Sequence, residues 1–296
     1  MKIVSFGEQI NEKIVLCLGF FDGLHLGHRT IIDRAKQMAE KNSAKLALFT
    51  FDDYFSTLFK GDGLIFTLEE RLKIFEDSGV DIIVIAPSIN EILSLSQNTF
   101  LEKIYSTYNL FGVCCGFDYT FGYKGLGNSK LLEKYFLSKG VEVSVLPPYQ
   151  FNGETISSKS IKKLLKNGEI SLANKLLGCN YVTSGEVISG VKLGRTMGFP
   201  TLNTLFPQNK TPLCSGVYKT LTEIDGVLYK SVTNFGNAPT FDRYNFVIET
   251  HVLNFNQNVY GKIVKIYFLD YIRGLAKFNS MEDLITQLKE DVKVHD

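Results

Sequence analysis

Residues 18–30 read LGFFDGLHLGHRT and overlap the end of the apolar run 14–20, IVLCLGF. The run predicts a buried strand, and the amphipathic segment that follows predicts a helix beginning near residue 29 or 30. His25 and His28 therefore fall at a strand-to-helix junction, where the positive end of a helix and its unpaired N–H groups favour an anion. Three glycines let the backbone approach a ligand closely: Gly19, Gly23 and Gly27. The stretch predicts a polyphosphate cradle in which imidazoles stabilise charge on a phosphate.

Short apolar runs alternate with amphipathic segments through the first half of the chain. The runs predict buried strands at residues 46–51, 81–86, 112–117 and 141–147, and the segments between them predict helices at 68–79, 98–108 and 129–140. Continuous apolar strands separated by helices indicate a parallel sheet that is covered on both faces. Such sheets bind ligands at the carboxyl ends of their strands, and residues 19–28 follow one of those ends.

A different pattern begins near Tyr181. Residues 157–177 predict two short helices that break at Asn167–Gly168. Short strands with turn residues between them are then predicted at 181–188, 216–224, 227–235, 246–255 and 263–269. Closely spaced strands indicate an antiparallel barrel or sandwich, and a last helix opens with Ser280 as its N-cap. We therefore expect two domains, residues 1–180 and residues 181–296.

The composition is that of a globular chain without a strong overall charge. Of the 296 residues, 45% are hydrophobic and 21% are charged, and the formal net charge is +1. The low net charge argues against nucleic-acid or membrane partners. We also expect a monomer or a weak homo-oligomer. The five cysteines form no CxxC pair, so reduced thiols in a cytoplasmic protein are expected. The N-terminus lacks a signal-peptide layout, and no stretch is apolar enough to span a bilayer.

The string GFFDGLHLGH at 19–28 resembles the GxFDGxHxGH signature of the bacterial bifunctional riboflavin kinase/FAD synthetase family, whose first domain is a Rossmann-like HxGH nucleotidylyltransferase. Residues 67–81, 116–127 and 156–178 resemble further segments of that family in the same order. The resemblance implies that the first domain transfers AMP from ATP to FMN, giving FAD and pyrophosphate, with His25 and His28 as catalytic residues. It also implies binding residues for ATP (Gly19, Phe21, Asp22, Gly27, Ser158 and Lys162) and for the flavin (Asp118 and Phe121).

A second family signature lies in the C-terminal half. Residues 193–203, LGRTMGFPTLN, resemble the riboflavin kinase motif GRxxGFPTxN. The resemblance implies a barrel that phosphorylates riboflavin to FMN, with Glu249 as the catalytic carboxylate and Arg273 contacting the flavin phosphate or the nucleotide. It implies that ATP and Mg²⁺ are held by Gly194, Arg195, Gly198, Pro200, Thr201 and Asn203, of which Thr201 and Asn203 are the metal ligands. Hydroxyl and amide oxygens are ligands that suit Mg²⁺ beside nucleotide phosphates.

The chain departs from the family pattern mostly in the first domain. The motif TFxPHP reads TFDDYF here, so Tyr54 stands at the histidine position. Thr120 replaces the arginine of GFDxRFG. In the SSTxIR motif Lys159 replaces threonine, and Lys162 replaces arginine, which keeps a charge but loses bidentate geometry. In the second domain, Leu275 stands where the family often has glutamate.

Three functions follow from these observations. The leading one is a bifunctional enzyme with riboflavin, FMN, FAD and ATP as its ligands. The second is a riboflavin kinase whose first domain has lost adenylyl transfer, which the changes at Tyr54, Thr120 and Lys159 motivate. The third is a flavin-sensing regulator that acts on nucleic acid. Its only support is the lysine-rich segment 159–166, and the net charge of +1 argues against it.

Overall fold

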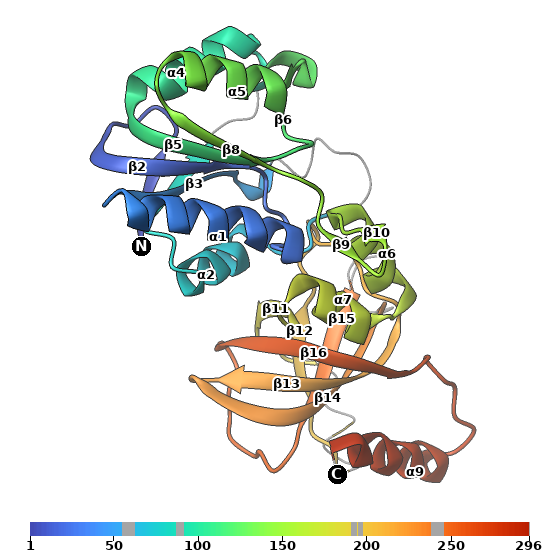
Figure 1. The fold of residues 1–296 in the computed structure, drawn as a ribbon. Coiled ribbons are helices and arrows are strands. Elements are labelled where there is room, and N and C mark those ends of the chain that lie inside the picture. Colours follow the sequence, from blue (N-terminus) through green and yellow to red (C-terminus); the bar gives the residue numbers. More distant parts are fainter. Residues whose placement is uncertain (55–62, 87–91, 191–193, 195–197, 238–245, 296) are drawn as a thin grey trace. The chain divides into compact units, whose positions relative to one another are not determined.

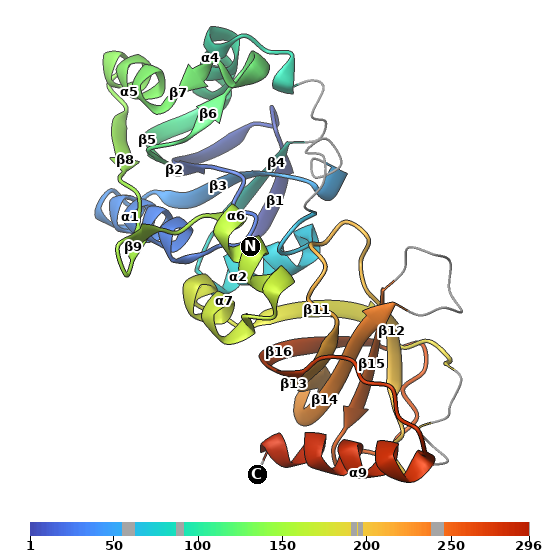
Figure 2. The same cartoon turned by 90° about the vertical axis from the view of Figure 1, so that its right-hand side faces the viewer.

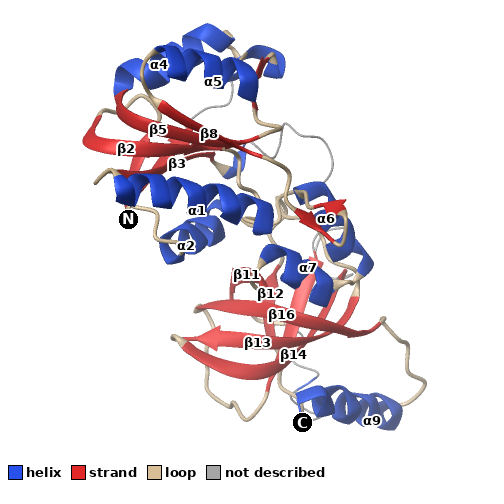
Figure 3. Ribbon diagram, viewed as in Figure 1, coloured by secondary structure: helices blue, strands red, loops and turns tan. Residues whose placement is uncertain are grey.

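The computed structural model describes residues 1–295 apart from 55–62, 87–91, 191–193, 195–197 and 238–245. The chain folds into two compact units, one formed by residues 1–61 and 67–158 and the other by residues 62–66 and 159–296. Figure 1 and Figure 2 trace the chain through both units, and Figure 3 distinguishes their helices from their strands.

The first unit is built on a six-stranded sheet with the strand order β1-β4-β3-β2-β5-β8. The strands are β1 Lys2–Ser5, β2 Ile10–Leu18, β3 Lys45–Phe51, β4 Ile82–Ala86, β5 Tyr108–Gly116 and β8 Glu142–Leu146. Every neighbouring pair is parallel, which confirms the predicted parallel sheet. The sequence did not predict strand β1, because its residues are mostly exposed and form no continuous apolar run.

Helices cover both faces of this sheet, as predicted. Helices α1 (Leu26–Lys41) and α2 (Leu68–Asp77) lie on one face, and α4 (Gln97–Thr107) and α5 (Ser129–Ser138) lie on the other (Figure 1). Each face has its own hydrophobic cluster. Helix α1 begins at Leu26, earlier than the predicted start near residue 29, because the side chain of His25 caps it. His28 therefore lies in the first turn of the helix, not before it.

The direction of chain progression reverses between β2 and β5. From β2 the chain continues through α1 to β3 on one side, whereas β5 pairs with β2 on the other side. The carboxyl ends of β2 and β5 are adjacent, since Leu18 pairs with Cys115. Residues 19–28 and residues 116–121 consequently leave the sheet side by side, at the switch point where open α/β sheets bind ligands.

The second unit contains an antiparallel six-stranded sheet with the order β11-β16-β13-β14-β15-β12. The strands are β11 Tyr181–Glu186, β12 Leu202–Leu205, β13 Gly216–Ile224, β14 Val227–Asn237, β15 Phe246–Val252 and β16 Ile263–Arg273. Beyond β11, the N–H of Ile188 donates to the carbonyl oxygen of Asn203 in β12 at 2.8 Å. This bridge brings the two edges together, so the predicted barrel is confirmed in a nearly closed form.

Buried hydroxyl groups mark the inner face of the barrel. They form a hydrogen-bonded chain in which each oxygen lies 2.8–2.9 Å from the next, in the order Thr222, Ser231, Thr220, Thr233 and Thr250. Thr233 and Thr250 are directly paired on β14 and β15. Because side chains alternate along a strand, the residues next to these two point to the opposite, outer face.

Three helices and one short segment complete the second unit. The helices are α6 (Ser158–Asn167), α7 (Ile170–Leu177) and α9 (Met281–Val292), and Ser280 caps α9 as predicted. Asn174 in α7 donates to the carbonyl oxygen of Phe268 in β16 at 2.8 Å. Residues 63–66 also belong here, because Leu64 exchanges backbone hydrogen bonds with Asn209 and Thr211 at 2.6 and 2.7 Å. Sequence patterns placed this segment in the first domain.

Candidate active sites

The loop after β2 has a tightly fixed backbone. Phe21 has a positive φ of 54° and only 1% of its surface is exposed. Its ring lies against Gly19, where a Cβ atom would come within 2.7 Å of Phe21 Cζ. The same ring meets His28 edge-on, with centroids 5.2 Å apart. Gly19 and Phe21 therefore shape the loop, and a direct contact of Phe21 with ATP stays a prediction.

His25 and His28 are in direct contact at the N-terminus of α1. Nδ1 of His25 accepts a hydrogen bond from the backbone N–H of His28 at 3.3 Å, and the two rings are stacked 3.7 Å apart. Burial lowers the pKa of His25 to about 4. The pKa of His28 is also lowered, first by burial and then by the proximity of His25. Both rings are therefore neutral near pH 7 in the absence of a ligand.

The contacts also assign the tautomer of His25. Because Nδ1 accepts a hydrogen bond, the single proton of the neutral ring must lie on Nε2. His25 thus offers an N–H donor from a buried position at the N-terminus of helix α1. Gly27 leaves room for this ring, since a Cβ there would lie 3.2 Å from His25 Nδ1. The arrangement can donate to an oxyanion without carrying a resident positive charge.

Arg71, a buried arginine on α2, ties the loop after β2 to the end of β3. Its guanidinium donates to the carbonyl oxygens of Phe20 and Phe51, to Thr50 Oγ1 and to Asp53 Oδ1, at 2.9–3.3 Å. Burial lowers its pKa, while the nearby carboxylates of Asp22, Asp53 and Asp52 oppose that shift. Sequence analysis missed this residue. The only feature of the sequence that could have indicated its role is a cationic side chain early in the helix predicted at 68–79, which follows the acidic segment TFDD at 50–53.

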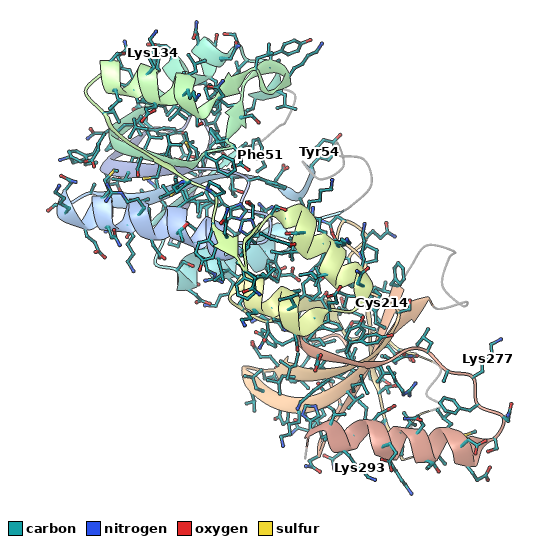
Figure 4. The ribbon with its side chains drawn as sticks, turned by 45° about the vertical axis from the view of Figure 1, so that its right-hand side comes forward. Phe51, Tyr54, Lys134, Cys214, Lys277 and Lys293 are labelled. Atoms are coloured by element: carbon teal, nitrogen blue, oxygen red, sulfur yellow. The ribbon has the colours of Figure 1, made fainter. Side chains whose placement is uncertain are left out.

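Asp53 stands where the family motif has its first proline, and it makes its own contacts. Its Oδ1 accepts from the backbone N–H of Leu68 at 2.6 Å as well as from Arg71. Tyr54 follows it with 62% of its surface exposed (Figure 4). The loop is therefore held by a carboxylate at the position where the family has a rigid ring.

The segment after β5 forms the second wall at the switch point. Asp118 is exposed, and its Oδ1 lies 3.0 Å from the position that a Cβ on Gly116 would occupy. Phe121 is 5% exposed and stacks between Phe100 and Tyr119, with centroids 5.3 and 5.8 Å away. Asp118 is thus free to meet a ligand, whereas Phe121 supports the segment from behind.

Ser158 and Lys162, the other two residues expected at the ATP site, both lie on α6. Ser158 is the last residue of the first compact unit, and Lys162 belongs to the second. Lys159, the lysine in place of threonine, lies on the same helix. Contacts of Ser158 and Lys162 with ATP stay predictions.

In the second unit, one row of side chains crosses three neighbouring strands. Glu249 on β15 pairs with Asn203 on β12 and with Asn234 on β14. Directly paired residues share a face, and this is the outer face, opposite Thr233 and Thr250. Asn234 Nδ2 donates to Glu249 Oε2 at 3.3 Å. Asn203 and Glu249, which the resemblance implies as a metal ligand and the catalytic carboxylate, are thus neighbours, and these roles stay predictions. Asn234 was not among the predicted site residues.

The segment before β12, where the sequence predicts phosphate binding, is anchored to the same face. Nδ1 of His251 lies 2.8 Å from the carbonyl oxygen of Pro200, and its ring packs on Phe199 with centroids 5.2 Å apart. The N–H of Phe199 donates to the carbonyl oxygen of Gly194 at 2.8 Å, and Gly198 has a φ of 80° in open space. Arg195 lies outside the described residues. Thr201 immediately precedes β12, and Asn203 lies two residues further along.

Arg273 is engaged by Asp291 of helix α9. Its Nε and one terminal nitrogen donate to the two carboxylate oxygens at 2.8 and 2.6 Å, and Asp291 is 2% exposed. Its other terminal nitrogen donates to the carbonyl oxygen of Gly274 at 3.1 Å. These contacts anchor α9, and a contact of Arg273 with a ligand stays a prediction.

The oxygen atoms around Asn203 fit a magnesium ion that is shared with nucleotide phosphates. The Thr201 hydroxyl and the Asn203 amide oxygen are the ligands that the resemblance implies, and the Glu249 carboxylate is on the residue paired with Asn203. Gly190 leaves space for the Asn203 side chain, since a Cβ there would lie 2.5 Å from Asn203 Nδ2. Across the described ranges, no group of three or more His, Cys, Asp or Glu is placed to hold a metal by itself. Mg²⁺ keeps waters and uses one or two protein groups together with phosphates, so a sparse site suits it.

Comparisons with known proteins match both halves of the chain. Residues 7–160 match the family model for FAD synthetase, and residues 177–296 match the model for riboflavin kinase. Relatives named bifunctional riboflavin kinase/FMN adenylyltransferase include one from Bacillus subtilis, 35% identical over 96% of this chain and 92% of its own length. Another such relative, from Listeria monocytogenes, is 34% identical over 97% of this chain and 93% of its own length. A solved structure described as a macrolide-efflux protein from Streptococcus pneumoniae is 29% identical, with a TM-score of 0.87 over 99% of this chain and 98% of that one.

The fold and the two sites define a transferase with a nucleotidylyltransferase domain and a flavokinase barrel. The chain belongs to the family of bifunctional riboflavin kinase/FMN adenylyltransferases, the enzymes of FAD biosynthesis. Riboflavin kinase and FMN adenylyltransferase activities follow from this membership, and neither alternative from the sequence is favoured. Among the helices of the described residues, none has the length and apolar composition needed to cross a bilayer.

Proposed function

We propose that the second domain phosphorylates riboflavin at Glu249 and that the first domain adenylylates the resulting FMN at His25 and His28. One observation carries the proposal for the first domain: the stacked histidine pair stands intact at the helix N-terminus despite the altered motifs around it. We place the functional boundary near residue 180. We also expect the enzyme to act in the cytoplasm, where its free cysteines would stay reduced.

In the first domain, an oxygen of the FMN phosphate attacks the α-phosphorus of ATP. The new P–O bond forms as the bond to the bridging oxygen breaks, and pyrophosphate leaves with that electron pair. Attacking and leaving groups are both anions, so no proton has to be moved. Charge develops on the α-phosphate, and the Nε2–H of His25 and the first N–H groups of α1 would stabilise it, which the cap contact of His25 at the helix N-terminus supports.

Other residues of the first domain would hold the two substrates. Gly19 and Gly27 let the backbone approach the triphosphate, and Asp22 lies buried in the same loop. Ser158 and Lys162 would bind its outer phosphates, as the family pattern implies. Asp118 would orient the flavin from the end of β5. Arg71 and Asp53 keep the neighbouring loop in place.

In the second domain, the terminal hydroxyl of the ribityl chain attacks the γ-phosphorus of ATP. Its proton passes to the Glu249 carboxylate as the new P–O bond forms, and ADP leaves with the electrons of the broken bond. Thr201 and Asn203 would hold Mg²⁺, which neutralises phosphate charge when bound. His251 fixes the backbone at Pro200 and so keeps this pair in position. Gly194, Gly198 and Arg195 would complete the phosphate-binding turn.

Two variants of the full-length chain separate the two activities. His28→Ala should abolish formation of FAD from FMN and leave formation of FMN intact. Glu249→Gln should have the opposite effect, since Gln cannot accept the proton. If Glu249→Gln still phosphorylated riboflavin at the wild-type rate, the proposed role of Glu249 would be wrong. We do not extend the efflux activity in the streptococcal protein's name to this chain, because the residues of both sites match flavin-directed motifs.

A further inference from the structure

We infer that Asn234 binds riboflavin directly, with Oδ1 accepting a hydrogen bond from the ribityl hydroxyl next to the one that is phosphorylated, while Nδ2 orients Glu249. This inference rests on the proposed role of Glu249. Asn234 opens the segment 234–241, NFGNAPTF, which resembles a further segment of the riboflavin kinase family, but the resemblance gave this residue no role. The assignment comes from its place in the row, the direction of its amide and the lack of a donor at its oxygen.

The orientation of the Asn234 amide follows from chemistry. Its nitrogen lies 3.3 Å from Glu249 Oε2, and a carboxylate accepts hydrogen bonds. A reversed amide would place two acceptor oxygens against each other, so the nitrogen must face Glu249. The carbonyl oxygen Oδ1 then points away from Glu249. Asn234 therefore has one end committed to the catalytic carboxylate and the other end available to a second group.

None of the described residues supplies that second group. Within the described residues, Asn234 Oδ1 is buried and has no hydrogen-bond partner. A buried acceptor that is left unsatisfied is destabilising, and few positions in a native protein tolerate one without a reason. A ligand that brings a donor to this oxygen would recover the cost. An amide oxygen only accepts, so the ligand group must carry an O–H or N–H.

An apolar side chain covers the position beside Asn234 on the same face. Gly236 is two residues further along β14, is buried and has no side chain of its own. The nearest neighbour there is Leu275, whose Cδ1 lies 3.3 Å from the position a Cβ on Gly236 would take. Leu275 is itself 55% exposed. The polar oxygen of Asn234 thus has an apolar neighbour, an arrangement that suits an organic substrate better than a chain of phosphates.

The strand order separates the two substrates. Glu249 on β15 lies between Asn203 on β12 and Asn234 on β14. The nucleotide and its metal ion are proposed on the Asn203 side, so the acceptor substrate belongs on the Asn234 side. The phosphates of ATP offer no donor, whereas the ribityl chain carries several hydroxyl groups. With Nδ2 bound to Glu249, the hydroxyl nearest to Oδ1 is the neighbour of the one that Glu249 deprotonates.

The test compares riboflavin with its 4′-deoxy analogue, which lacks that neighbouring hydroxyl, in full-length wild type and in Asn234→Ala. Wild type should prefer riboflavin roughly tenfold to a hundredfold in kcat/KM, because the analogue leaves Oδ1 unpaired. In Asn234→Ala this preference should fall to near unity. Flavin fluorescence titrations without ATP should show the same loss of discrimination in Kd. Asn256→Ala, an exposed asparagine in the loop between β15 and β16, is the matched control and should keep the wild-type preference.

The outcomes distinguish this inference from the proposed function. If Asn234→Ala slowed both substrates equally and kept the preference, Asn234 would act only through Glu249 and the ribityl contact would be wrong. If wild type showed no preference, the contact would also be wrong. If wild type did not phosphorylate riboflavin at all, the proposed function of the second domain would fail instead.

Discussion

The imidazole rings of His25 and His28 are stacked, with centroids 3.7 Å apart and planes 17° from parallel. Because His25 also accepts a hydrogen bond from the backbone of His28, the two residues form one unit in the first turn of α1. Two protonated rings at this distance would repel each other, and burial makes each charge costly. The pair therefore stays neutral until an anion arrives, and it then provides donors at the place where negative charge grows.

The first prediction concerns stability against pH. The pKa of His25 is about 4 in the folded chain and near 6.5 when unfolded, so the unfolded state binds the proton first. Stability is full above pH 6.5 and declines as pH falls toward 4, by up to about 3 kcal/mol from this residue. His25→Asn keeps a capping side chain but does not titrate. Urea unfolding at pH 7.5, 6 and 5 should show a smaller loss for the variant; equal losses would contradict the burial account.

The second prediction concerns Arg71. Arg71→Met removes four side-chain hydrogen bonds of a buried cation and breaks its ion pair with Asp53. We expect the free energy of unfolding of the first unit to fall by about 3–5 kcal/mol. Lys73→Met on the same helix removes only exposed ion pairs and should change it by less than about 0.5 kcal/mol. Equal effects of the two substitutions in a denaturant titration would show that the Arg71 contacts contribute little.

The third prediction decides between two roles of Arg273. Arg273→Lys loses the paired contact with Asp291, so the second unit should be destabilised by about 1–3 kcal/mol while the KM values for riboflavin and ATP stay within about twofold. Lys277→Ala, an exposed residue shortly after β16 (Figure 4), is the control for lost charge. A tenfold rise in KM with unchanged stability would instead give Arg273 the ligand contact that the resemblance implied.

The fourth prediction concerns the segment at residues 63–66. Gly63 has a φ of 62°, and a Cβ there would come within 2.5 Å of the backbone carbon of Lys210. Gly63→Ala should therefore lower the thermal midpoint of the second unit by several degrees, through both strain and collision. Gly140→Ala has a similar φ of 77° with nothing within 4 Å, so it measures the strain alone. A Gly63→Ala protein no less stable than Gly140→Ala would mean that the segment does not dock as described.

Patterns along the chain predict most of the fold, because each signal is local. Apolar runs locate five of the six parallel strands, and alternation locates five of the six barrel strands. The start of α1 was placed late because His25 caps the helix with a ring nitrogen, and histidine is not a common cap. Strand β12 was missed because it has only four residues. It also overlaps the riboflavin kinase motif at residues 193–203, which was analysed for ligand binding and not for secondary structure.

The missed parts of the sites depend on distant contacts. Arg71 matters because β2, β3 and α2 meet at its guanidinium, and Asn234 matters because β14 pairs with β15 in one particular register. Neither the register of two paired strands nor the point where three elements converge can be predicted from the sequence of one segment alone. The same holds for residues 63–66, whose backbone pairs with residues about 145 positions further along the chain. Sequence motifs predicted the candidate catalytic and ligand-binding residues. The fold shows which other residues hold them in place.

The central claim is that one chain converts riboflavin to FMN and FMN to FAD. The most direct measurement follows riboflavin, FMN and FAD separately over time in purified wild type with riboflavin, ATP and Mg²⁺. The account predicts that FMN rises first and that FAD follows with release of pyrophosphate. FMN that accumulates without FAD, even at high enzyme concentration, would contradict it and leave a kinase whose histidine pair no longer catalyses adenylyl transfer.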